Sequence, residues 1–143
     1  MSKNIPLQNL PFYLLGLFKQ AVDTSLKRIG LRGVRELSRL FKTEGKSLDV
    51  TWDPLQQAYL AQKIRSGKSD KILHRTTTLA QSFGYTAGAG EVEIGTTTTP
   101  YAIFHEYGTK QGIPPRPFIY PVGKYFIKEG IPGDEFMKAL QGA

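Results

Sequence analysis

Residues 100–118 read PYAIFHEYGTKQGIPPRPF, and this stretch carries the most definite structural signals in the chain. Its leading proline and the residues of 101–107 predict a short helix, which Gly108 ends. The three prolines within 111–117 predict a stiff loop with little conformational entropy to lose. Alternating apolar residues at 118–122 then predict a strand. The stretch as a whole predicts a helix, a rigid loop and a strand in close succession.

The residues just before this stretch predict a β-hairpin. Apolar residues alternate with small or polar ones over 83–87 and again over 91–94, on either side of the turn-like sequence Ala-Gly-Ala-Gly at 87–90. This alternation places Glu91 and Glu93 on the solvent side of the hairpin.

The N-terminal half is predicted to be helical after an arm at residues 1–8. A first apolar stripe ends at Gly30, which predicts a helix stop there. A second stripe follows over 31–41. Because Gly33 weakens the junction, the two stretches form either two helices or one kinked helix. The stripes have spacings of three or four residues and comprise Leu14, Phe18, Val22, Leu26, Ile29, Leu31, Val34, Leu37 and Phe41.

A further helix is predicted directly after Trp52, with Asp53 as its N-cap and Pro54 at its first helical position. It runs through Leu55 and ends near residues 66–67. A tryptophan beside an N-cap is expected to pack as a hydrophobic anchor rather than to bind a ligand.

The order of the elements predicts an α+β fold, with N-terminal helices packed on a small, mainly antiparallel sheet with short helices. A short helix from Thr76 through Leu79 and Phe83 and an amphipathic helix at 134–140 complete the set. A chain of 143 residues is expected to form a single domain. We expect this domain to span 1–143, with an arm at 1–8, a helical part at 9–67 and a sheet-containing part with the C-terminal helix at 68–143.

The net charge of +7 is unevenly distributed along the chain. Residues 1–75 carry 14 Lys and Arg against 6 Asp and Glu, whereas residues 76–143 carry 5 against 6. This asymmetry is typical of a face that meets nucleic acid or an acidic protein, and equally of a solvated basic helix face. The candidates for such a face are Arg32, Arg35 and Arg39.

Composition excludes several classes of site. The chain has no cysteine, so disulfides, thiolate metal sites and cysteine catalysis are absent. The apolar run at 10–18 is shorter than the ~20 residues that span a bilayer, so no membrane partner is expected. Synthesis in a cytoplasm is compatible with this composition.

Catalytic motifs are also missing. The pair His105-Glu106 matches the first half of a zinc-protease helix, but Thr109 stands where that motif needs its second histidine. The other histidine, His74, is remote in the sequence. No serine lies in a G-x-S-x-G elbow, and the glycines match neither a P-loop nor a dinucleotide fingerprint. We therefore predict no catalytic residue, no metal and no cofactor.

The stretch at 100–118 resembles the signature of the phage virion morphogenesis family, also called the tail-completion family. That signature is Tyr-Ala-x-x-His-x-aromatic-Gly, then a loop, then Ile-Pro-x-Arg-Pro-Phe. A looser Trp-x-Pro-Leu element matches upstream, at 52–55. Between it and the stretch at 100–118 lies another loosely matching element, in which Thr77 stands where the family usually has glycine. The sequence Glu-Tyr-Gly-Thr at 106–109 is also similar to that of a related tail-component family of long-tailed phages. The matching positions are Trp52, Pro54, Leu55, Tyr101, Ala102, His105, Tyr107, Gly108, Pro114, Arg116, Pro117 and Phe118.

The resemblance implies a non-enzymatic structural subunit of a tailed-phage virion, at the head–tail junction or the top of the tail. It implies tail completion, tail termination or neck formation by assembly into a homo-oligomeric ring, expected to be a hexamer. Neighbouring neck and tail-tube proteins are the expected partners, with non-specific contact to genomic DNA. Assembly would take place in the cytoplasm of the bacterial host.

Individual roles follow from the residue types. The aromatic residues of 101–107 are expected to anchor their helix on the sheet, and His105 to be a structural hydrogen-bonding residue. Arg116 is expected either at a subunit interface or paired within its own subunit, and Phe118 in the core. Two rival functions stay open: a small basic DNA-binding module and a small virion-associated hydrolase that depends on His105 or Glu106.

Overall fold

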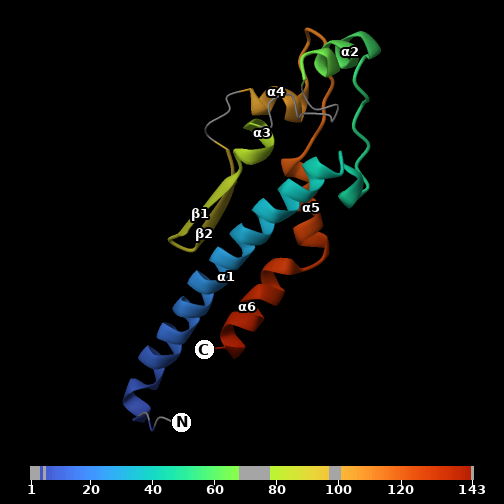
Figure 1. The fold of residues 1–143 in the computed structure, drawn as a ribbon. Helices are drawn as coiled ribbons and strands as arrows, with labels where there is room; N and C mark the ends of the chain where they lie inside the picture. Colours follow the sequence, from blue (N-terminus) through green and yellow to red (C-terminus); the bar gives the residue numbers. More distant parts are fainter. Residues whose placement is uncertain (1–3, 5, 68–77, 97–100, 143) are drawn as a thin grey trace.

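The computed structural model describes residues 4, 6–67, 78–96 and 101–142. Within them, one long helix runs along the molecule, with a β-hairpin on one side and two helices on the other (Figure 1). The predicted α+β class is confirmed. The elements in chain order are α1 (Leu10–Lys42), α2 (Gln57–Arg65), α3 (Thr78–Gln81), β1 (Gly84–Gly88), β2 (Glu91–Gly95), α4 (Ala102–Tyr107), α5 (Ile119–Lys128) and α6 (Ile131–Gln141), with short 3-10 turns at Leu7–Asn9 and Lys46–Leu48.

Helix α1 is continuous across both apolar stripes, so the predicted stop at Gly30 is wrong. Gly30 and Gly33 are instead buried where the hairpin crosses the helix. A Cβ atom on Gly30 would overlap the ring of Tyr85, and one on Gly33 would overlap the end of Ile94. The glycines therefore permit close packing between helix and hairpin, which is a second common use of this residue.

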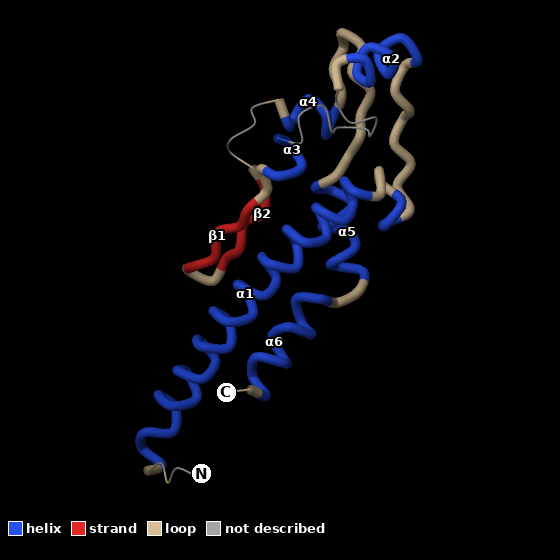
Figure 2. Tube along the Cα trace, in the orientation of Figure 1, coloured by secondary structure: helices blue, strands red, loops and turns tan. Residues whose placement is uncertain are grey.

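The predicted hairpin is confirmed, and its two antiparallel strands form the only sheet among the described residues (Figure 2). Tyr85 pairs with Ile94 and faces α1, whereas Glu91 and Glu93 are exposed. The turn residue Ala89 has a φ of 50° and the following glycine one of 78°. Two consecutive positive φ angles are typical of the tight turns that match the twist of a hairpin.

The core is centred on the C-terminal half of α1. Phe41 is fully buried there, and its ring centroid lies 5.5 Å from that of Trp52. The rings of Phe83 and Phe118 lie 5.4 Å from Phe41 and from each other. This cluster joins the long helix, the end of the hairpin and the start of α5. The prediction that Trp52 is a hydrophobic anchor is confirmed, because the side chain is only 4% exposed.

Two sequence-based boundaries are wrong. Residues 118–122 form no strand, because α5 begins at Ile119. Asp53 is no N-cap, because α2 begins at Gln57 and the segment before it is extended. The amphipathic C-terminal helix and the helix of 101–107 are confirmed, the former starting earlier, at Ile131. Thr76, His74, Thr77 and Pro100 lie outside the described residues.

Candidate functional site

The signature residues come together where loop 51–56, helix α4 and loop 108–118 meet below α2. The two loops run side by side in Figure 2, and the contacts described below join them to α4. We call this arrangement the motif clamp. Its geometry explains most of the residue types that the sequence singles out.

Glu106 caps helix α5 from a distance of twelve residues along the chain. Its Oε2 accepts hydrogen bonds from the backbone N–H groups of Phe118 at 2.8 Å and Ile119 at 3.1 Å. Its Oε1 accepts a third, from Tyr120 N–H at 3.0 Å. The first N–H groups of a helix have no partner inside the helix and carry partial positive charge, so a carboxylate satisfies both needs. This cap also explains why 118–122 is helical. Phe118 occupies the N-cap position, and its ring cannot accept hydrogen bonds, so Glu106 supplies the acceptors instead.

Arg116 joins the two loops. Its side chain is 7% exposed, and its Nε donates to the carbonyl oxygen of Asp53 at 2.8 Å. Its Nη2 donates to the carbonyl oxygen of Pro54 at 3.3 Å. These bonds engage the backbone at the point where a helix start was predicted, and there the chain stays extended. Burial lowers the pKa of Arg116, while the nearby Asp53 and Tyr59 act in the opposite direction.

Trp52 ties the same loops together on the core side. Its indole Nε1–H donates to the carbonyl oxygen of Pro117 at 2.8 Å, and its ring packs against Phe41. A buried indole N–H that lacked a partner would cost free energy, so this bond lets the ring enter the core. Leu55, on the same loop, packs against the core as a partly buried residue.

Gly108 closes the turn between α4 and the proline-rich loop, as predicted. Its φ is 73°, and a Cβ atom there would lie 2.8 Å from the carbonyl oxygen of Ile113. The turn is held by Thr109 N–H, which donates to the Ile113 carbonyl at 2.9 Å. Arg116 N–H donates to the His105 carbonyl at 2.8 Å. Both the backbone angle and the close approach therefore require glycine.

His105 contributes to the clamp through its backbone rather than its side chain. Its Nδ1 is buried and has no hydrogen-bond partner among the described residues, so the expected side-chain hydrogen bond is not found there. Its ring stands edge-on to Tyr101, with centroids 6.0 Å apart. Burial lowers the pKa of His105 below its ordinary value of 6.5, and the charge of Arg116 lowers it further. A neutral imidazole is therefore favoured in the folded protein.

The aromatic residues of α4 do not anchor it, contrary to expectation. Tyr101 is 39% exposed, Phe104 50% and Tyr107 76%, whereas Ala102 is buried and faces the core. A short helix with a buried alanine and exposed aromatic side chains offers those side chains to a partner. Pro114 and Pro117 are partly buried, and Phe118 lies in the core as expected.

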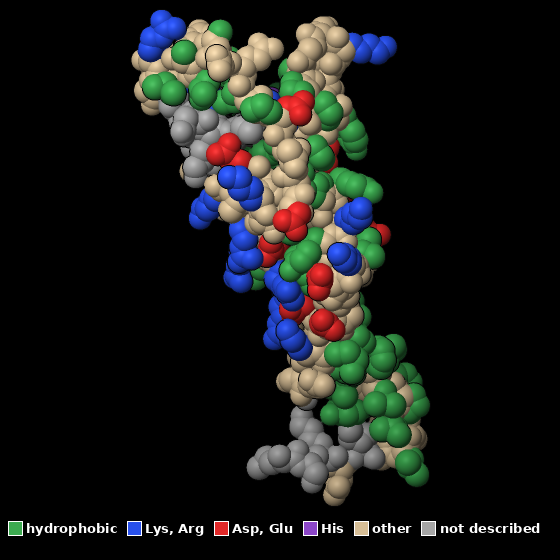
Figure 3. Space-filling view, turned by 90° about the vertical axis from the view of Figure 1, so that its right-hand side faces the viewer, with side chains coloured by type: hydrophobic (Ala, Val, Ile, Leu, Met, Phe, Trp, Pro, Cys, Tyr) green, Lys and Arg blue, Asp and Glu red, His purple; other side chains and the backbone are tan. Residues whose placement is uncertain are grey.

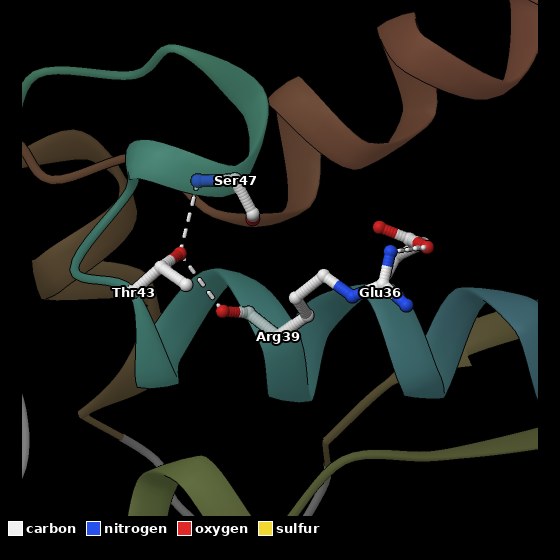
Figure 4. Close-up of polar contacts among 4 residues, drawn as sticks. All are labelled: Glu36, Arg39, Thr43 and Ser47. Atoms are coloured by element: carbon white, nitrogen blue, oxygen red, sulfur yellow. Dashed lines mark hydrogen bonds and ion pairs between the residues drawn. The ribbon is translucent and has the colours of Figure 1, made fainter.

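The three candidate arginines of α1 line one groove, together with Arg28 and Lys138. Arg32 Nη1 lies 2.8 Å from Glu135 Oε1 of α6. The side chain of Arg39 lies along α1 and pairs with Glu36, with 3.2 Å between Nη1 and Oε1 (Figure 4). At the end of the helix, the hydroxyl of Thr43 donates to the carbonyl oxygen of Arg39. Arg35 is exposed. The groove therefore combines paired cations with others that face solvent.

No group of three or more His, Asp or Glu residues in the described part of the chain is arranged to hold a metal ion. Glu106, which the sequence shows only as half of a metal-binding motif, was not predicted as a helix cap. A signal for it existed in the sequence: an acidic residue next to a turn-forming glycine and a stiff loop that returns the chain toward it.

Comparison with known proteins matches the model of the phage virion morphogenesis family to residues 14–131 of the chain. The match runs from residue 14, inside α1, to the first residue of α6 and includes the whole motif clamp. No curated protein and no solved structure matches the chain.

Proposed function

Because this chain belongs to the phage virion morphogenesis family, we propose that it is a structural, non-enzymatic subunit at the head–tail junction or the top of the tail. It acts by assembling into a homo-oligomeric ring, for which we propose six subunits. The ring completes the tail and offers a docking surface to neighbouring neck and tail-tube proteins. Tail completion, tail termination and head closure are all forms of this role.

The observation that carries the proposal is that polar side chains of the motif clamp are engaged in structural hydrogen bonds, the signature residue Arg116 and its neighbour Glu106 among them. Both carboxylate oxygens of Glu106 accept helix N–H groups, and the guanidinium of Arg116 is bound to two carbonyls. Groups engaged in this way stiffen a scaffold and are poorly placed to act on a substrate. Around the clamp, the aromatic residues of α4 are exposed and suited to contact a neighbour.

The first experiment removes the protein from the phage and locates it in the particle. Without the chain, we expect full heads and separate tails whose upper ends fail to join. Electron microscopy of virions with an antibody-bound gold label should place the protein at the neck. Label at the baseplate, or absence of the protein from the particle, would contradict the proposal.

The groove along α1 supports a second element of the proposal, non-specific contact with DNA that passes through the ring. Arg28 and Arg35 are exposed and have no ion-pair partner among the described residues. When cations along a helix bind the phosphates of DNA, counterions are released from the DNA backbone, so the affinity for DNA depends steeply on salt concentration.

This contact is tested with duplex DNA at several salt concentrations. Arg35→Glu should weaken binding and flatten the salt dependence, whereas Lys46→Glu, an exposed charge outside the groove, should change it little. Tight binding by a monomer that plays no part in the particle would instead favour the rival function, a small DNA-binding module. For the other rival, a virion-associated hydrolase, a His105→Phe variant should keep its fold and lose activity.

A further inference from the structure

The first turns of α1 form an apolar arm that no other described element covers. Figure 1 shows this end of the helix projecting beyond both α6 and the hairpin. Where the helix reaches α6, the ring of Phe18 lies 5.7 Å from that of Phe136. We call residues 7–18 the N-terminal arm. Its exposed large side chains are Leu7, Leu10, Phe12, Tyr13, Leu14, Leu15 and Phe18.

The arm is apolar around its whole circumference. Phe12 is 77% exposed and Leu14 48%, and two residues of separation put them on opposite sides of the helix. No charged residue lies between Lys3 and Lys19. The hydrophobic side chains gather visibly at this end of the molecule (Figure 3). A helix that is hydrophobic on all sides is normally buried. None of the helices among the described residues combines the length and the hydropathy of a membrane span.

A receptor of matching chemistry lies at the other end of the same chain. A pocket of 380 Å³ opens between α4, the end of the hairpin and the start of α5. Among the described residues that line it, only Glu106 is charged, and its two oxygens already accept hydrogen bonds from α5. The exposed apolar side chains that line it are Ile103, Tyr107, Ile119 and Tyr120.

Resting on the ring proposed above, we propose that the N-terminal arm of one subunit seats in this apolar pocket of the next. The exposed area of the arm is on the order of 900 Å², against roughly 300–600 Å² for the largest apolar patch of a typical monomer. This total, summed over all sides of the helix, is close to one partner's share of a standard interface, ~800 Å², and the pocket covers the side that faces it. The described residues of the two surfaces carry no free charge that the other surface must neutralise.

The positions of the two surfaces decide the symmetry of the contact. The arm lies at one end of α1, a helix roughly 50 Å long, and the elements that line the pocket, α4, the end of the hairpin and the start of α5, lie toward the other end (Figure 1). A contact between two different patches is heterologous, so each subunit uses its arm on one neighbour and its pocket on the other. A closed ring is the finite assembly that such contacts build.

The test measures the mass of the full chain in solution by light scattering, with one variant at each surface. Phe12→Glu disables the arm and Tyr107→Asp disables the pocket, at side chains of nearly equal exposure, 77% and 76%. Each should raise the concentration for half-assembly by at least about tenfold. Ile127→Glu, 80% exposed and outside both surfaces, should assemble like the unmodified chain.

Mixing the two variants distinguishes the proposed contact from an arm-to-arm contact. The Phe12→Glu subunit keeps an intact pocket and the Tyr107→Asp subunit an intact arm, so the mixture should form a one-to-one heterodimer. An arm-to-arm dimer would be lost with Phe12→Glu, unaffected by Tyr107→Asp and not restored by mixing. That result, or an unmodified chain that stays monomeric, would overturn the inference.

Cross-linking gives an independent readout, because the chain has no cysteine. The double variant Leu15→Cys with Tyr107→Cys should form a ladder of covalent oligomers with a short bismaleimide, whereas Leu15→Cys alone should not. Efficient cross-linking by Leu15→Cys alone would refute the contact. Failure of these tests, with the protein still located at the neck, would leave the proposed function standing and remove only the arm-to-pocket contact.

Discussion

At the scale of single residues, three polar side chains hold the motif clamp in one arrangement, and two of them, Trp52 and Arg116, are buried. Glu106 binds the start of α5, Arg116 binds the carbonyls of the 51–56 loop, and Trp52 binds the carbonyl of Pro117. Each bond joins segments far apart in the sequence. Where the group left behind is buried, as the guanidinium of Arg116 and the indole of Trp52 are, loss of its partner costs more than the bond itself contributes.

The contribution of the Glu106 cap can be measured directly. We expect Glu106→Gln to lower the free energy of unfolding by about 1–3 kcal/mol, because the charge and one of the acceptor oxygens are lost from the start of a helix. Denaturant titration of the purified chain measures this. Glu93→Gln, an exposed carboxylate on the hairpin, is the matched control and should cost less than about 0.5 kcal/mol.

His105 predicts a dependence of stability on pH. Its folded-state pKa lies below the ordinary value of 6.5, so the unfolded chain binds the proton more readily. The stability from neutral His105 is fully present above this ordinary pKa and is lost as the pH falls from there through the lowered folded-state pKa. Unfolding titrations from neutral to mildly acidic pH should show this loss, to be compared with His105→Phe. An equal slope in the variant would contradict the assignment.

At the scale of elements, the packing of the hairpin on α1 depends on the absence of side chains at two helix positions. Gly30 and Gly33 face Tyr85 and Ile94. A Cβ atom on Gly16, in the same helix, would instead point into open space, with no neighbouring side chain within 4 Å. Glycine is therefore expected to stabilise the fold where the hairpin packs on the helix and to destabilise the helix at the open position.

This contrast yields a paired prediction for the helix glycines. Gly16→Ala should stabilise the chain by about 0.5–1 kcal/mol, because alanine is the better helix former and nothing obstructs it. Gly30→Ala should destabilise it by about 1–3 kcal/mol, because the new methyl group displaces the Tyr85 ring. Thermal unfolding of both variants checks the signs. Stabilisation by Gly30→Ala would show that the hairpin can move away from α1 without lowering the stability of the fold.

The elements also show which structures local sequence can predict. The hairpin was predictable because its turn and its alternation lie within about a dozen residues. The start of α2 was not, because Arg116, 63 residues away, binds the carbonyl of Asp53. The helix after Phe118 was not either, because Glu106, although only twelve residues away, reaches it only once the proline-rich loop has turned back. Gly30 was misassigned as a stop because a glycine for close packing and a glycine for a helix end look alike in sequence.

At the scale of the whole molecule, apolar side chains are divided between a core around Phe41 and the exposed N-terminal arm. Leu37 and Phe41 are fully buried, whereas Phe12 is 77% exposed. Only the first group stabilises an isolated subunit. The second contributes when another molecule covers it.

This division predicts that stability and assembly respond to different variants. Leu37→Ala should lower the free energy of unfolding by about 2–5 kcal/mol, because it leaves a cavity in the core. Phe12→Ser should change it by less than about 0.5 kcal/mol and still reduce assembly. Denaturant titration at a concentration where subunits are monomeric makes the comparison. A large destabilisation by Phe12→Ser would place the arm inside the subunit's own fold.

Periodicity, turn chemistry and short motifs were enough to predict the α+β class, the basic helical face, the hairpin, the stiff loop and the family. The roles of several individual residues became visible only in the folded chain: Glu106 as a cap, Arg116 as a link between loops, Gly30 as a packing position. The physical reason is that these roles are hydrogen bonds and contacts between distant segments. A local pattern can indicate that the chain turns back, as the loop before Phe118 does, but it does not specify which groups will then meet.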